Sequence, residues 1–144
     1  DLLYEIIKSF EQITDKNLKL NTKNVKKKIP LTRSPEITYG LRNFIGNAVK
    51  FSKKNVNINL LSENKKTTVI ISDDGPGFPS DIFKIIGEPY IASKSKKVLS
   101  KSGLGLGTFI GKTLLERKKA NIDFTKGSNG GAVVEITWNN KDLI

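Results

Sequence analysis

The 144-residue chain contains no cysteine, no histidine and no methionine. Without cysteine and histidine it cannot form disulfides, a Cys/His zinc site, or a catalytic dyad or triad that uses an imidazole base. No apolar run approaches the roughly 20 residues that cross a bilayer, and no segment has the pattern of a signal peptide. We therefore expect a soluble domain whose chemistry uses carboxylates, amides, lysines, backbone groups or a bound cofactor.

The chain is strongly basic, with 25 Lys and Arg residues against 14 Asp and Glu residues and a net charge of +11. Nearly all of this charge is lysine, which favours a solvated lysine surface, although a polyphosphate or nucleic-acid partner would also fit. The length predicts one domain with a substantial core. Because the chain opens at Asp1 without an initiator Met, we expect a piece of a longer protein.

Apolar periodicity predicts an alternation of helices and strands. Helical spacing is found over 1–14, 35–52 and 108–119, and Ser34 before Pro35 predicts an N-cap for the second helix. Strands are expected at 17–20 and 25–29 around a polar turn, at 56–60 and 67–72 as a hairpin, and at 121–125 and 132–138 as another hairpin. This alternation predicts an α/β or α+β fold.

Residues 73–107 interrupt this alternation with an irregular segment rich in Gly, Pro, Ser and Lys, apart from a helical turn expected at 81–86. Connections of this length inside a compact domain are usually functional lids or disordered. Part of this segment, Gly103-Leu104-Gly105-Leu106-Gly107, runs into the third helix. Backbone N–H groups of such glycines, together with the helix N-terminus, can hold a phosphate, but a flexible hinge has the same composition.

Lys112 follows Gly111 and precedes Thr113, which superficially suggests a Walker A phosphate-binding loop. That motif requires a glycine at the position where this chain has Leu106. Helical spacing continues through the segment, so Lys112 is expected to be an exposed helical lysine.

Asp73-Asp74-Gly75-Pro76-Gly77 directly follows a strand that is expected to be buried. A carboxylate at a strand end can accept a hydrogen bond from an exocyclic amine, and a Gly-Pro-Gly turn allows a flat ring to approach the backbone. An ordinary turn rich in Asp is the alternative interpretation.

Asn43, Asn47 and Lys50 follow one another at helical spacing, on the side of the second helix opposite its apolar stripe. Amide oxygens suit a hard cation such as Mg²⁺, and a nearby ammonium would offset phosphate charge. Taken alone, two asparagines on a helix are equally well explained as surface residues.

In this order and at these intervals, the three elements resemble the nucleotide-binding boxes of the sensor histidine kinases. Residues 41–52 resemble the N box, Asp73–Gly77 the G1 box, 83–90 the F box, and Gly103–Gly107 the G2 box. The resemblance covers essentially the whole chain and implies the Bergerat (GHKL) ATP-binding fold of these kinases, Hsp90, type II topoisomerases and MutL. This fold is a two-layer sandwich in which about three helices cover one face of a mixed β-sheet, with a mobile ATP lid. Residues 87–93 and 105–117 are most similar to the redox-responsive RegB/PrrB/ActS-type kinases.

The resemblance also implies a role for each site residue. Asp73 would accept the adenine amino group, Gly75 and Gly77 would let the base lie against the backbone, and Asn47 would hold Mg²⁺. Asn43 and Lys50 would be the catalytic residues, in contact with the phosphates or the metal shell. The other ATP-binding residues implied are Tyr90, Lys94, Gly103, Leu104, Gly105, Leu106, Gly107 and Thr108, with the lid over about 87–102.

Asn43 stands where hydrolytic relatives of this fold carry a glutamate that activates water. An amide lacks the basicity for that role, which favours phosphoryl transfer over hydrolysis. The resemblance therefore implies the catalytic domain of a two-component sensor histidine kinase. It would bind Mg-ATP and transfer the γ-phosphoryl group to a histidine on a separate dimerisation domain, for relay to the receiver domain of a response regulator.

The family's acceptor histidine is absent from this chain, so the resemblance places 1–144 as a single catalytic and ATP-binding domain without its dimerisation domain. By analogy, the parent would be a membrane-anchored bacterial kinase with this domain in the cytoplasm, and the fragment itself would be monomeric. A serine kinase or ATPase of the same fold is an alternative. A basic nucleic-acid-binding module is a more distant one, since no nucleic-acid partner is expected.

Overall fold

The computed structural model describes residues 2–25, 34–78, 107–128 and 130–143. Within these residues, three α-helices and one 3₁₀ helix accompany a five-stranded sheet of order β1-β2-β3-β5-β4. The elements are α1 (Leu2–Glu11), β1 (Asn17–Val25), α2 (Pro35–Phe51), β2 (Asn55–Ser62), β3 (Lys66–Asp73), α5 (Gly107–Arg117), β4 (Asn121–Lys126), β5 (Ala132–Asn139) and η1 (Asn140–Asp142). The helical turn expected at 81–86 lies outside the described residues.

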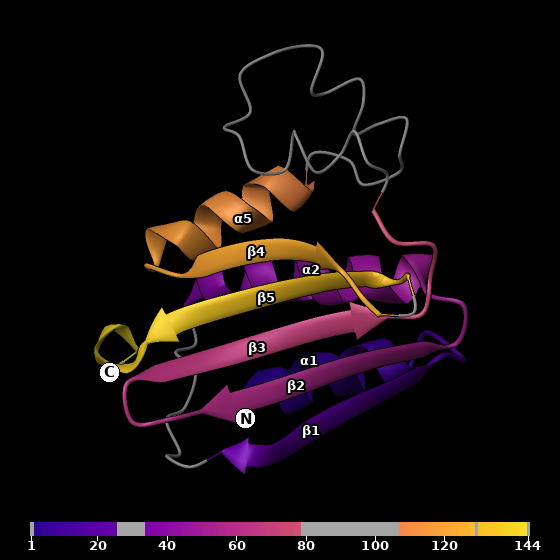
Figure 1. The fold of residues 1–144 in the computed structure, drawn as a ribbon. Coiled ribbons are helices and arrows are strands. Elements are labelled where there is room, and N and C mark those ends of the chain that lie inside the picture. The colour runs from indigo at the N-terminus through magenta and orange to yellow at the C-terminus, as the bar shows by residue number, and fades with distance from the viewer. Residues whose placement is uncertain (1, 26–33, 79–106, 129, 144) are drawn as a thin grey trace.

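The sheet is mixed, and its helices lie on one side. Strands β1 and β2 are parallel, whereas the pairs β2–β3, β3–β5 and β4–β5 are antiparallel. Parallel neighbours need a crossover connection, and α2 comes between β1 and β2 in the chain. Figure 1 shows α1 and α2 behind the sheet. The predicted two-layer α/β architecture is confirmed.

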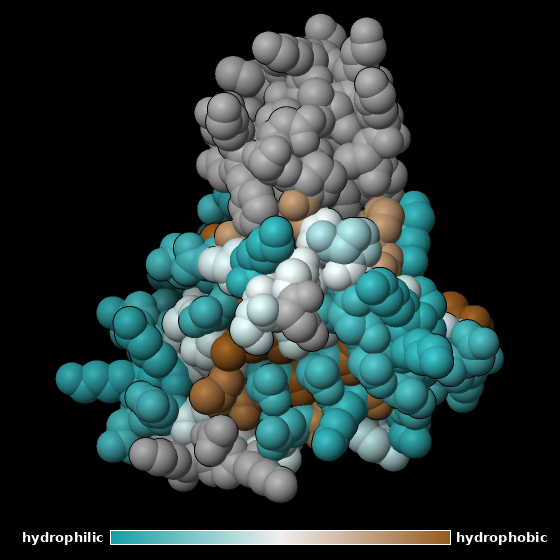
Figure 2. Space-filling model, turned by 45° about the vertical axis from the view of Figure 1, so that its right-hand side comes forward, coloured by the Kyte–Doolittle hydropathy of each residue, from teal (hydrophilic) through white to brown (hydrophobic). Residues whose placement is uncertain are grey.

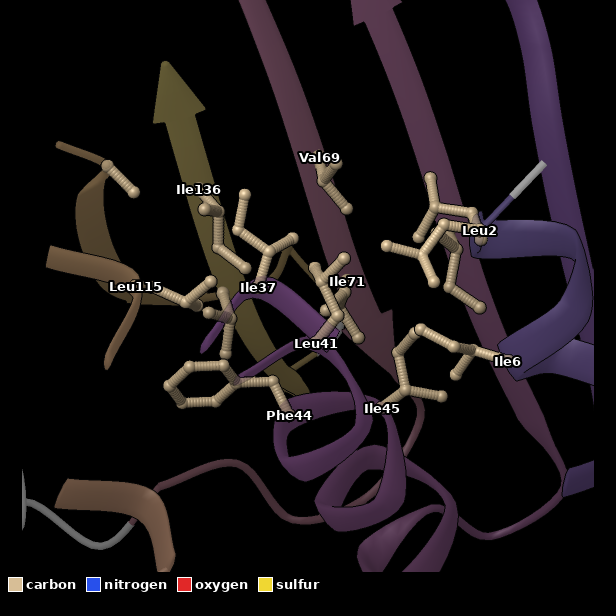
Figure 3. Close-up of a cluster of buried hydrophobic side chains, with 14 of the residues drawn as sticks. Leu2, Ile6, Ile37, Leu41, Phe44, Ile45, Val69, Ile71, Leu115 and Ile136 are labelled. Atoms are coloured by element: carbon tan, nitrogen blue, oxygen red, sulfur yellow. The ribbon is translucent and has the colours of Figure 1, made fainter. Parts of the chain in front are cut away.

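The core forms where the apolar stripe of α2 meets the sheet. The predicted stripe residues are all buried: Ile37, Leu41, Phe44, Ile45 and Ala48. Figure 3 shows this stripe facing side chains of β3, β5, α5 and α1, namely Val69, Ile71, Ile136, Leu115, Leu2 and Ile6. Because full burial of one such side chain contributes about 1.5–3 kcal/mol, this packing fixes how α2 is rotated about its axis. The side of α2 that carries the asparagines is thereby left for a site.

The first strand differs from the prediction. In place of two short strands around a polar turn at 21–24, β1 is one strand from Asn17 to Val25, with a register shift against β2 between Asn21 and Asn24. Leu18 and Leu20 pair with buried positions of β2, and the pairing continues through the polar residues that follow, which are therefore part of the strand. An edge strand tolerates such polar residues, so composition alone misled the prediction. The rest of the predicted second strand, 26–29, lies outside the described residues.

Helix ends follow local chemistry. The Ser34 hydroxyl accepts a hydrogen bond from the Ile37 N–H (3.1 Å), as expected of an N-cap.

Lys112 is helical as predicted, but the expectation that it is exposed is wrong. Its side chain is 14% exposed, and its Nζ lies 3.1 Å from Oε1 of Glu116 one turn later.

On the face that Figure 2 shows, most of the described residues are hydrophilic, and hydrophobic ones gather in smaller areas. Among the described residues, no helix has both the length and the apolar character needed to cross a membrane.

Helix α5 ends in a left-handed turn occupied by a lysine. Lys119 has φ 67°, and hydrogen bonds from Ala120 N–H to Leu115 C=O (3.1 Å) and from Lys119 N–H to Glu116 C=O (2.9 Å) close the turn. This pattern is a Schellman motif, in which glycine is preferred at the left-handed position.

We predict that Lys119→Gly raises the free energy of unfolding by about 0.5–1 kcal/mol, because relief of the left-handed strain exceeds glycine's entropy cost. Chemical denaturation measures this. Lys119→Ala is the matched control, since it also loses the weak ion pair with Asp142 (3.8 Å) but keeps the strain. Equal stability of the Gly and Ala variants would contradict the prediction.

Candidate functional site

A cavity of about 210 Å³ opens between α2, the sheet and the first turn of α5. Its lining residues come from α2, the sheet, the segment after β3 and the start of α5: Phe44, Asn47, Ala48, Phe51, Ile71, Asp73, Pro76, Gly77, Phe78, Thr108, Phe124, Ala132 and Val134. Most of this lining is apolar, and few polar groups interrupt it, as in typical small-molecule sites. Of the predicted site residues, the structure brings Asn47, Asp73, Gly77 and Thr108 together on this single cavity.

Asp73 is the buried carboxylate of the site. It ends β3, is 9% exposed, and accepts hydrogen bonds from the backbone N–H groups of Gly75 (2.8 Å) and Ala132. Burial raises the pKa of the Asp73 carboxyl above its ordinary value, and the charge of Asp74 acts in the same direction. The two N–H donors and the ammonium of Lys16 oppose this rise. Asp73 is thus an acceptor held at the edge of an apolar cavity.

The turn after Asp73 needs its glycines. A Cβ on Gly75 would lie 2.2 Å from the carbonyl oxygen of Phe51, and Gly77 has φ +81° with a Cβ position 2.4 Å from the carbonyl oxygen of Gly130. Any side chain at these positions would push the turn away from its neighbours. The glycines therefore let this turn pack closely against the end of α2 and the connection between β4 and β5.

Asn47 joins α2 to the first turn of α5. Its amide nitrogen donates to Thr108 Oγ1 (2.9 Å) and, at 3.5 Å, to Asn43 Oδ1. Because the nitrogen serves both partners, within the described residues the amide oxygen of Asn47 is left as a ligand for a hard cation. No group of three acidic, His or Cys residues that could hold a metal occurs in the described ranges.

The other residues predicted to contact the phosphates or the metal lie less close to the cavity than Asn47 and Thr108 do. Asn43 contacts α5, since its Cβ lies 3.3 Å from the Cβ position of Gly111, but it does not line the cavity. Lys50 is exposed, with its ammonium 5.2 Å from the ring centroid of Phe51. Gly107 opens α5. The F box at 83–90, the lid at 87–102, and Tyr90, Lys94, Gly103, Leu104, Gly105 and Leu106 lie outside the described residues.

Sequence reasoning missed the aromatic walls of the cavity. Phe124 of β4 lies 5.7 Å from Phe44 and 5.7 Å from Phe78 between ring centroids, the latter pair edge to face, and Phe51 also lines the cavity. Phe44 was expected only as core. Phe124 pairs with buried Val134 and so points to the helix side, but this pairing is known only from the sheet and gave no signal in the sequence.

Comparison with known proteins agrees with this geometry. The model of a family described as histidine kinase-, DNA gyrase B- and HSP90-like ATPases matches residues 33–142. The chain belongs to this family. The predicted resemblance is therefore confirmed, and ATP is the nucleotide that membership implies.

The relatives are sensor kinases. The sensor histidine kinase RegB of Cereibacter sphaeroides is 35% identical over 124 aligned residues, and the match covers 75% of this chain and 27% of RegB. The sensor protein kinase PilS of Pseudomonas aeruginosa is 35% identical over 68 residues, 47% of this chain and 12% of PilS. The chain thus spans about a quarter, or less, of the length of these curated relatives.

Solved structures show the same fold. The nucleotide-free catalytic domain of histidine kinase ThkA superposes with a TM-score of 0.75 at 21% identity, covering 96% of this chain and 92% of that domain. Full-length ShkA in complex with AMPPNP superposes with a TM-score of 0.70 at 20% identity, covering 94% of this chain and 28% of ShkA. The Bergerat-type fold of the family is confirmed.

We predict that Asp73→Asn increases stability at neutral pH, because Asn keeps an acceptor for the Gly75 N–H without burying a charge. Below the ordinary pKa of 3.8, Asp73 is protonated in both the folded and unfolded states, and the variants should be alike. As the pH rises through that value and through the higher pKa of the folded state, the wild type should become less stable than Asp73→Asn.

Urea denaturation between about pH 3 and pH 7 measures this difference. Asp123→Asn, at an exposed position of β4, is the control and should show no such divergence. A wild type that is more stable than Asp73→Asn at neutral pH would mean that the N–H donors outweigh burial.

Proposed function

We propose that this chain is the catalytic and ATP-binding domain of a two-component sensor histidine kinase. The observation that carries the proposal is the single cavity on which Asp73, Asn47 and Thr108 converge, in a chain of this ATPase family. Residues 1–144 would form this one domain, and the dimerisation domain with the acceptor histidine would lie elsewhere in the parent protein.

The adenine base would occupy the apolar end of the cavity. Asp73 would accept the hydrogen bond of the exocyclic amine, and the rings of Phe44, Phe51 and Phe124 would cover the faces and edge of the base. A purine with an exocyclic carbonyl at that position would present an acceptor to the carboxylate. Selection of adenine over guanine follows from this mismatch, because an unpaired buried acceptor is costly.

The triphosphate would lie toward α5. The Asn47 amide oxygen would hold Mg²⁺, Asn43 and Lys50 would contact the phosphates or the metal shell, and the N–H groups of Gly103–Thr108 would bind phosphate oxygens. Tyr90 and Lys94 would approach from the lid at 87–102. The ShkA structure, which has the same fold, is a complex with AMPPNP, and this supports nucleotide binding by this fold. When bound, Mg²⁺ would neutralise the charge that develops on the phosphates.

The residues along α2 favour transfer of the γ-phosphoryl group over hydrolysis of ATP. Neither Asn43 nor Asn47 can take a proton from water, so catalysis would consist of positioning and charge neutralisation. The γ-phosphoryl group would pass to a histidine on the dimerisation domain and then to a response regulator. The kinship with RegB supports this relay, and attachment to a membrane would come through other parts of the parent protein.

Asp73→Asn should weaken ATP binding about ten- to a hundredfold, because a hydrogen bond to a charged acceptor contributes about 1.5–3 kcal/mol. Calorimetric titration with Mg-ATP measures this, and Asp123→Asn again serves as the control. Unchanged ATP affinity in Asp73→Asn would refute the site. Saturable DNA binding by a wild type that does not bind ATP would favour the nucleic-acid module instead.

Asn47→Ala should remove the Mg²⁺ dependence of nucleotide binding, since it deletes the proposed metal ligand. The measurement compares ATP affinity with Mg²⁺ and with EDTA in each variant. Asn57→Ala, at an exposed position of β2, should keep the dependence of the wild type. If Asn47→Ala also keeps it, the metal is held by other groups.

A further inference from the structure

Lys16, in the loop between α1 and β1, binds the end of α2. Its Nζ donates to the carbonyl oxygens of Val49 (2.5 Å) and Ser52 (2.7 Å) and, more weakly, to that of Lys50 (3.4 Å). The last carbonyls of a helix lack partners within the helix, and they carry the negative end of its dipole. An ammonium has three donors, so the whole donor capacity of Lys16 is used on this one helix end.

Asp74 binds the backbone that follows. Its carboxylate accepts hydrogen bonds from the N–H groups of Lys53 (2.7 Å), Lys54 (3.1 Å) and Asn55 (3.1 Å). Although desolvation acts to raise the pKa of Asp74, these donors and the Asn55 side chain lower it to about 2. The connection from α2 to β2 is thus held by a cation on its carbonyls and by an anion on its amides.

Phe51, within the segment whose carbonyls Lys16 binds, forms one wall of the cavity. The ring of Phe51 lines the cavity, and its carbonyl oxygen is the group that packs against Gly75 in the turn after Asp73. Lys16 itself does not line the cavity. A shift of the α2 end would therefore move both the Phe51 wall and the turn that presents the Asp73 carboxylate.

We propose that Lys16 is a positioning residue for adenine recognition: by holding the last carbonyls of α2, it sets the distance between the Phe51 wall and the Asp73 carboxylate. This inference rests on the proposed function, because it concerns the base-binding end of the same site. The phosphate end is supported separately by the Asn47–Thr108 hydrogen bond, which lies two to five residues before the carbonyls that Lys16 binds. Loss of Lys16 should thus affect one end of the cavity only.

The test compares Lys16→Met with Lys19→Met, a change of the same size at an exposed position of β1. For each folded variant, the affinities for Mg-ATP and for Mg-tripolyphosphate, which has no base, are measured by competition with a fluorescent ATP analogue. Lys16→Met should bind ATP about tenfold more weakly and tripolyphosphate as the wild type does, because it loses hydrogen bonds from a charged group at the base end only. Lys19→Met should change neither affinity.

Two results would overturn the proposal: unchanged ATP affinity in Lys16→Met, or an equal loss for both ligands, which would mean that Lys16 supports α2 as a whole. A wild type that fails to bind ATP would instead refute the proposed function. Should Lys16→Met not fold, Lys16→Gln keeps a shorter donor for one carbonyl. It should lose part of the ATP affinity and none of the tripolyphosphate affinity, and wild-type ATP affinity in that variant would overturn the proposal.

Discussion

The packing of α2 against the inner face of the sheet is the constraint on which the rest of the structure depends. Leu41 and Ile45 have no exposed surface, so the helix cannot rotate without opening the core. With this rotation set, Asn47 faces the cavity and Thr108 of α5 lies within hydrogen-bond distance of it. The position of α2 thus determines both the hydrophobic core and the polar side of the site.

The site departs from what stability alone would favour. A carboxylate lies at the edge of an apolar cavity, where burial raises its pKa, and the apolar walls around it leave empty volume. Both features cost free energy, because a buried charge loses hydration and a cavity loses packing contacts. Such local departures from good packing are expected where a ligand completes the structure. The ligand that we propose for this arrangement is a flat base with an exocyclic amine.

Much of the fold could be predicted because it is encoded locally. The stripe of α2, its Ser34 cap and both hairpins follow from periods and turn residues within short segments. Asn43 and Asn47, which their spacing predicted to lie on one face of the helix, likewise contact each other across neighbouring turns. The first strand was mispredicted because its polar middle is stabilised by β2, which lies more than 30 residues away in sequence. No local pattern reports such pairing.

The sequence by itself determined which chemistry is available: amides along one helix, a carboxylate at a strand end, and glycines in the turns, with no imidazole or thiol. Only the tertiary structure decided that these groups share a cavity, that Phe124 closes its wall, and that Lys16 holds the end of α2 beside it. The physical reason is that helix periods and turn preferences act over a few residues. Burial and long-range hydrogen bonds, by contrast, depend on which segments the whole chain brings together.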